Sequence, residues 1–173
     1  MAINRAERKQ NQALYCASKK NCVFISHKKE DLEAAKAIGE FLLNQINVDI
    51  YLDIYDITLQ EAVSLENDQK IIESIRTGLS MSTHLLCLVS DKTHLSWWVP
   101  YEIGIASNQE KRIASLKLKG TEDIPSFLKT EKVLMNIRDF LEYSKTYNPY
   151  NGLFLRKELN AINRLLLDHY VDR

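Results

Sequence analysis

The sequence has few residues that break regular structure and no long apolar run. Only five of its 173 residues are glycine and three are proline, whereas these two types make up about 12% of an average chain. This composition excludes a low-complexity, disordered protein. The longest strongly apolar run, residues 85–89, has five residues, while a membrane-spanning helix needs about twenty. We therefore expect neither a membrane span nor a signal peptide.

An excess of charge of one sign is also absent. Lysine and arginine together number 23, as do aspartate and glutamate, so the formal net charge is zero. This balance argues against a nucleic-acid backbone or an anionic membrane as the main partner. The three cysteines, Cys16, Cys22 and Cys87, are an odd number without a CxxC pair. That usage indicates a reducing, cytoplasmic compartment.

Several common catalytic devices are missing. The five glycines are too widely spaced to form a GxGxxG or Walker phosphate loop. There is no GxSxG motif, and none of the four histidines has the spacing of a metal ligand. We therefore expect no metal and no resident cofactor, and any nucleotide must be bound in another way.

The chain divides into a basic, weakly amphipathic N-terminal helical extension, residues 1–20, and one domain, residues 21–173. Apolar patterning in the domain alternates between strand and helix. We predict strands at 22–26, 48–53, 84–90, 113–118 and 133–137, and helices at 30–47, 70–79, 98–109 and 152–170. A long connection, residues 54–67, follows the second strand.

This alternation predicts an α/β fold, namely a flavodoxin-like open parallel sheet of about five strands with helices on both faces. The uninterrupted apolar run at 84–90 suits a central strand. In such sheets ligands bind outside the carboxyl ends of the strands. Attention therefore falls on residues 26–29, 53–67 and 90–102.

The most informative segment is the one that leads from the central strand into the next helix. Pro100 is tolerated only near a helix start, so Trp98 and Glu102 lie in its first turns and, four residues apart, on one face. An indole beside a carboxylate suits an aromatic cation attached to a sugar. We expect Ser96 to cap this helix, and Trp97 and Cys87 to be packing residues.

Three motifs in this order resemble the Toll/interleukin-1 receptor (TIR) domain family over about residues 21–140. The first is VFISHKKED at 23–31, similar to the family's opening strand and loop. The second is YLD at 51–53 with the loop after it, which corresponds to the family's second strand and BB loop. The third, at 86–102, is similar to the family's S…S-x-W-x-x-x-E signature.

The resemblance implies NAD⁺ glycohydrolase chemistry with Glu102 as the catalytic residue. It also implies roles in binding NAD⁺ for Trp98, Ser26, His27, Lys28, Asp53 and Ser90. The loop after Asp53 would complete a neighbour's site when TIR domains self-associate. Read from the residues alone, Glu102 is a surface acid, Ser26 ends a strand and Asp53 forms a turn.

The short format is similar to the bacterial stand-alone type, most of all to the TIR sensor of Thoeris antiphage defence. A protein of that type would respond to a phage component and make a cyclic ADP-ribose signal for a separate effector. Two other functions remain open. One is a TIR–TIR interaction module without turnover, and the other is nucleoside deoxyribosyl transfer through a nucleophilic glutamate.

Overall fold

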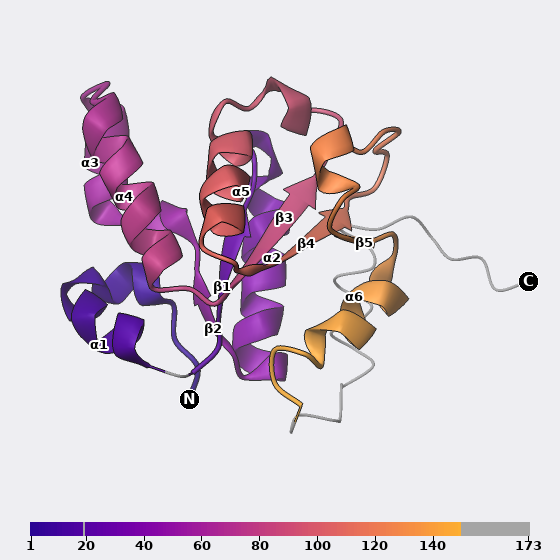
Figure 1. The fold of residues 1–173 in the computed structure, drawn as a ribbon, viewed down its shortest axis with the longest axis horizontal. Helices are drawn as coiled ribbons and strands as arrows, with labels where there is room; N and C mark the ends of the chain where they lie inside the picture. The colour runs from indigo at the N-terminus through magenta and orange to yellow at the C-terminus, as the bar shows by residue number, and fades with distance from the viewer. Residues whose placement is uncertain (19, 150–173) are drawn as a thin grey trace, which may run out of the picture.

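The fold is described here from a computed structural model, which describes residues 1–18 and 20–149 (Figure 1). Its centre is a parallel sheet of five strands in the order β2-β1-β3-β4-β5. The strands are β1 (Cys22–Ser26), β2 (Asp49–Tyr51), β3 (His84–Val89), β4 (Arg112–Lys117) and β5 (Lys132–Leu134). This order is that of flavodoxin-like sheets, so the predicted fold class is confirmed.

Helices cover both faces of the sheet (Figure 1). One face carries α2 (Leu32–Phe41), which continues as a π-helical turn (Leu42–Ile46), and α6 (Ile137–Ser144). The other face carries α3 (Ile57–Ser64), α4 (Asp68–Ser80) and α5 (Trp98–Asn108). Short 3-10 turns complete the connections: η2 (Lys29–Asp31), η4 (Asp53–Tyr55), η5 (Thr93–Leu95) and η6 (Ser126–Leu128).

Each strand divides its side chains between two cores, because successive residues of a strand point to opposite faces. In β1, Val23 and Ile25 pack under α2, whereas Cys22 and Phe24 pack under α4 and α5. All six residues of β3 are buried. A strand buried on both faces reads as a continuous apolar run, which is why β3 is the clearest strand in the sequence.

Two predictions of secondary structure are wrong. The connection at 54–67 contains helix α3, which begins where the Asp56 side chain accepts a hydrogen bond from the Leu59 N–H at 3.2 Å. Residue 137 does not end a strand but begins α6, where the Asn136 side chain accepts from the Asp139 N–H at 3.0 Å. Both helices have eight residues, too few to give strong periodicity. The helix predicted at 152–170 lies outside the described residues.

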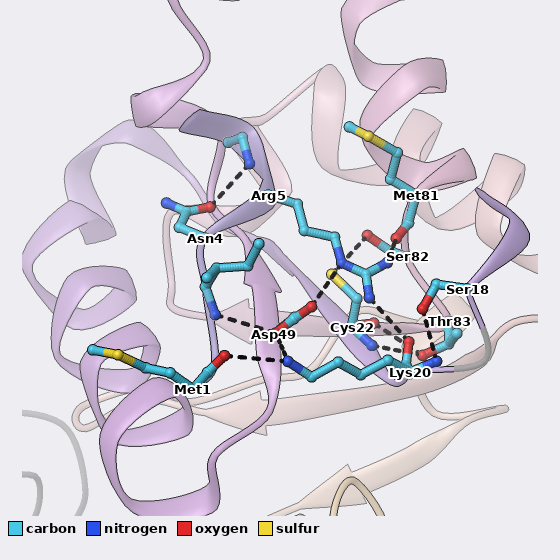
Figure 2. Close-up of polar contacts among 12 residues, drawn as sticks. Met1, Asn4, Arg5, Ser18, Lys20, Cys22, Asp49, Met81, Ser82 and Thr83 are labelled. Carbon is cyan, nitrogen blue, oxygen red and sulfur yellow. Dashed lines mark hydrogen bonds and ion pairs between the residues drawn. The ribbon is translucent and has the colours of Figure 1, made fainter. Parts of the chain in front are cut away.

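The chain before β1 lies along the free edge of β2. Residues 1–18 include η1 (Arg5–Asn11) and α1 (Gln12–Ala17). The Ile50 N–H donates to the Ile3 carbonyl at 3.1 Å, and Asn4 forms a parallel bridge with Ile50. Arg5 is 1% exposed and pairs with Asp49, as Figure 2 shows. Within the described ranges no helix has the length and apolar character to span a membrane.

Gly78 allows α4 to approach the ring of Tyr51. A β-carbon at Gly78 would lie 2.5 Å from Tyr51 Cε1, closer than atoms can pack. Tyr51 also stacks on Phe24, with ring centroids 5.4 Å apart, and its hydroxyl donates to Asp56. The stacking and the hydrogen bond therefore hold the ring in the space beside Gly78.

We predict that Gly78→Ala lowers the free energy of unfolding by about 1–3 kcal/mol through overpacking. The matched control is Gly104→Ala in α5, where an added β-carbon meets no atom within 4 Å. Gly104→Ala should stabilise the protein by up to about 1 kcal/mol, because alanine is the better helix former. Urea unfolding of the three proteins measures both effects, and equal stabilities of the two variants would contradict the packing argument.

His84 is a buried base at the start of β3. Its Nδ1 lies 2.8 Å from Thr83 Oγ1, and its Nε2 has no hydrogen-bond partner. Burial, with smaller contributions from Arg112 and Lys111, lowers the pKa of His84 from 6.5 to about 4. As the pH falls through this window the unfolded chain takes up a proton that the folded chain does not, so stability falls.

We predict that acidification from pH 6.5 towards 4 costs the wild type up to about 3 kcal/mol through His84. In His84→Phe, which keeps a ring beside Tyr147, this contribution disappears. Urea unfolding of both proteins at several pH values gives the two slopes. Parallel slopes would show that His84 does not titrate in this way.

Candidate active site

Three connections meet at the carboxyl edge of the sheet. β1 ends at Ser26, Asp53 follows β2, and Glu102 comes from α5, the helix after β3. The register pairs Phe24 with Tyr51 and Ser26 with Cys87. Asp53 lies beyond the last pair of β2 with β1, at the start of η4, and its carboxyl faces His27, the residue after Ser26. The topology therefore gathers residues from three sequence-distant motifs at one place.

Glu102 lies on the buried face of α5. The helix begins where Ser96 Oγ accepts a hydrogen bond from the Val99 N–H at 3.2 Å, which confirms Ser96 as its cap. Glu102 is 5% exposed and shares its face with Val99, Ile103 and Ala106. Ser26 Oγ donates to Glu102 Oε2 at 2.5 Å. The carboxyl group thus faces the end of the sheet, and the interpretation as a surface acid is wrong.

The surroundings of Glu102 favour its neutral form. Burial raises the pKa of Glu102 well above its ordinary value, the charge of Asp53 raises it further, and the Ser26 hydrogen bond opposes both. Burial also raises the pKa of Asp53, while His27 opposes that shift. A buried carboxyl beside a partly exposed one, both with raised pKa values, is typical of functional sites.

His27 faces Asp53, one of these two carboxyl groups. His27 Nδ1 lies 3.9 Å from Asp53 Oδ1 and 3.4 Å from the Ile25 carbonyl. Its side chain is only 4% exposed. Asp53 Oδ1 is buried and lacks a hydrogen bond, so this oxygen is unsatisfied in the closed site.

Lys28 and Ser90 lie in other contacts at the same edge. Lys28 Nζ faces Glu30 Oε1 at 3.4 Å. Ser90 Oγ donates to Asp31 Oδ2 at 2.7 Å, which ties the turn after β1 to the connection after β3. Asp31 belongs to the VFISHKKED motif, yet its contact with Ser90 was not predicted. The pairing depends on two loops that only the folded sheet brings together.

The two tryptophans differ from each other. Trp98 is half-buried, packs against the core under α4 and α5, and meets Tyr101 edge-on with ring centroids 6.2 Å apart. Trp97 is 91% exposed, so the prediction that it is a packing residue is wrong. Trp97 lies directly before the first residue of α5, and its side chain is exposed to solvent and does not pack in the core.

Glu102 lies beneath the surface of the molecule. A surface groove runs instead between α4 and α5, and its lining includes Arg76, Tyr101 and Ile105 but not Glu102. The low exposure of Glu102, 5%, leaves its carboxyl closed off from solvent in this conformation. In the described part of the chain, no cluster of histidine, cysteine and carboxylate side chains could hold a metal ion.

The fold and the site define a TIR-type domain. Among solved structures, the TIR domain of the Toll-related receptor TRR-2 from Hydra magnipapillata is similar, with a TM-score of 0.53. It is 17% identical, and the match covers 71% of this chain and 97% of that domain. At this identity the likeness concerns the fold alone.

A family model places the chain more narrowly. Residues 24–123, more than half of the chain, match the model described as Thoeris protein ThsB, TIR-like domain. The chain therefore belongs to this family, and the predicted resemblance to a TIR domain of the Thoeris type is confirmed. No curated protein matches the sequence.

We predict that Glu102→Gln folds and gains stability over the wild type as the pH rises. Because the folded pKa of Glu102 is raised, the folded state retains a proton that the unfolded state loses above about 4.5. Wild-type stability from this group is therefore lost from about pH 4.5 upward, and glutamine avoids the loss. Urea unfolding at pH 4.5 and 7.5 measures it; a constant difference between the two proteins would contradict the raised pKa.

Proposed function

We propose that this protein cleaves the bond between nicotinamide and ribose in NAD⁺, with Glu102 as the catalytic carboxylate, and converts the remainder into a cyclic ADP-ribose signal. The observation that carries the proposal is the buried Glu102 carboxyl bonded to Ser26 at the carboxyl edge of the sheet. Membership in a Thoeris TIR-like family supports it.

The chemistry accounts for so sparse a site. In NAD⁺ the nicotinamide ring is cationic, and it departs as a neutral molecule. Its departure therefore needs no strong general acid. The ribose then carries the positive charge of an oxocarbenium-like ion, and one ionised carboxylate nearby stabilises it. Ordinary glycosidases need a carboxylic acid as well as a carboxylate.

Glu102 must lose its proton for this role. Ser26 favours the ionised form, because its hydroxyl donates to the carboxylate. The cationic nicotinamide ring would favour it further when NAD⁺ enters and the site opens. Capture by water yields ADP-ribose and releases a proton. Attack by an adenine nitrogen or ribose hydroxyl of the same molecule yields a cyclic isomer with loss of a proton.

The other predicted residues take supporting roles in this proposal. Trp98 forms an apolar wall for nicotinamide or ribose, and His27 and Lys28 face the diphosphate. Asp53 and Ser90 shape the edge of the site through their contacts with His27 and Asp31. A cytoplasmic sensor of this kind would self-associate, respond to a phage component and pass its product to a separate effector.

One observation favours a second function. In the single chain Glu102 is buried, whereas Trp97 and Leu65 are 91% and 71% exposed. Exposed large apolar side chains suit docking of protein partners. The alternative is therefore a TIR–TIR interaction module without turnover.

We predict that the purified protein, incubated with NAD⁺ at low and high protein concentration, releases nicotinamide and forms a cyclic ADP-ribose isomer. Glu102→Gln should lower the rate at least about 100-fold, the usual scale for loss of a transition-state charge partner. Glu40→Gln, an exposed glutamate on α2, is the matched control and should keep full activity. Chromatography with mass detection measures the products.

Equal turnover by wild type and Glu102→Gln would overturn the assignment of Glu102. Absence of nicotinamide release at every concentration, and also in lysate of phage-infected cells, would favour the interaction module. Release of ADP-ribose alone would leave the cleavage intact but contradict the cyclic signal.

A further inference from the structure

The N-terminal segment, residues 1–11, reaches from one end of β2 to the other. At the carboxyl end of the strand, Asn4 Oδ1 accepts hydrogen bonds from the Leu52 N–H and the Ala6 N–H, both at 3.2 Å. Asn4 is 6% exposed. Pairing of β2 with β1 ends at Tyr51, and the next N–H, that of Leu52, is held by Asn4.

The amino end of β2 is held by a buried charge cluster (Figure 2). Asp49 accepts from Arg5 Nε at 3.0 Å, from the Ile3 N–H at 3.1 Å and from Lys20 Nζ at 2.5 Å. Arg5 also donates to the carbonyls of Met81 and Lys20. The Arg5 guanidinium and the Asp49 carboxylate each have further hydrogen-bond partners besides each other. Because breaking a buried ion pair is costly, the N-terminal segment is firmly anchored.

The anchored segment then leads to the candidate active site. Asn4 holds Leu52, the residue directly before Asp53, and η1 packs against η4, the turn that begins with Asp53. Asp53 Oδ1 lies 3.9 Å from Nδ1 of His27, the residue after Ser26, and Ser26 is the hydrogen-bond partner of Glu102. Asn4 and η1 precede the matched family region, which starts at residue 24.

We propose that Asn4 is a positioning residue of this site: by holding the backbone of Leu52 it keeps the Asp53 carboxyl beside His27, next to Ser26, the hydrogen-bond partner of Glu102. The N-terminal segment is then a working part of the site, and not only a cover for the edge of the sheet. The part of this inference that concerns turnover rests on the proposed function. The part that concerns geometry and charge does not.

The test is a titration of the Glu102 carboxyl in the full chain by ¹³C NMR, together with amide hydrogen exchange. The groups that bear on Glu102 are Asp53 and Ser26, with His27 beside Asp53, and Glu102 in turn bears on the buried thiol of Cys87. Asn4→Ala releases Asp53 towards solvent, where its charge is screened. We expect the pKa of Glu102 to fall by about 0.5 pH unit and exchange at residues 50–56 to quicken.

The matched control is Asn136→Ala, which removes the same kind of side-chain bond to a backbone N–H at the start of α6, next to β5. It should change neither the Glu102 titration nor exchange at residues 50–56. In an Asp53→Asn background, Asn4→Ala should cause no further shift, because the charge through which it acts is gone. Asn4→Ser, a milder change, should shift the titration by less and serves if Asn4→Ala does not fold.

Two results would overturn the proposal. One is a Glu102 titration that is the same in the Asn4 variants and in Asn136→Ala. The other is an equal shift with and without Asp53, which would show a structural effect only. If the wild type cleaves NAD⁺, Asn4→Ala should move the pH profile of kcat/KM, which reports the free enzyme, by the same amount as the titration. If it does not, the titration and exchange still decide on Asn4, so failures of the two proposals are distinguishable.

Discussion

A carboxyl group buried at the end of a parallel sheet is the constraint on which the rest of the site depends. Glu102 can lie there only because α5 presents it together with Val99, Ile103 and Ala106 to the core. A negative charge on Glu102 would be costly in that place. Burial therefore raises the pKa of this carboxyl, while the hydrogen bond from the Ser26 hydroxyl favours its ionised form.

The edge strand β2 is the second element on which the site depends. It is three residues long, too short to be stable by itself, and it is held from three directions. Tyr51 stacks on Phe24 and fills the space that Gly78 leaves. Asp49 joins the buried cluster with Arg5, and the N-terminal segment pairs along the outer edge. The position of η4, the turn that begins with Asp53, therefore depends on contacts at both ends of β2.

Much of this architecture could be predicted from periodicity. The five strands lie close to the predicted residues because buried parallel strands leave continuous apolar runs. The placement of Glu102 in the first turns of α5 followed from Ser96 and Pro100, which mark a helix start. Helices α3 and α6 were missed because two turns of helix give little periodic signal, although Asp56 and Asn136 are N-cap residues in the structure. Trp97 was misjudged because hydrophobic character does not say which way a side chain points before a helix begins.

The sequence by itself determined the order of the five strands along the chain, the absence of a glycine-rich phosphate loop and the motifs that mark a TIR-type domain. These properties are local, and each depends on residues within one segment. Only the tertiary structure decided that Ser26 bonds to Glu102, that Asp53 bears on the same carboxyl, and that Arg5 and Asp49 pair 44 positions apart. Such contacts depend on strand order and register, which join segments that are distant in the chain, and local patterns carry no record of which segments will meet.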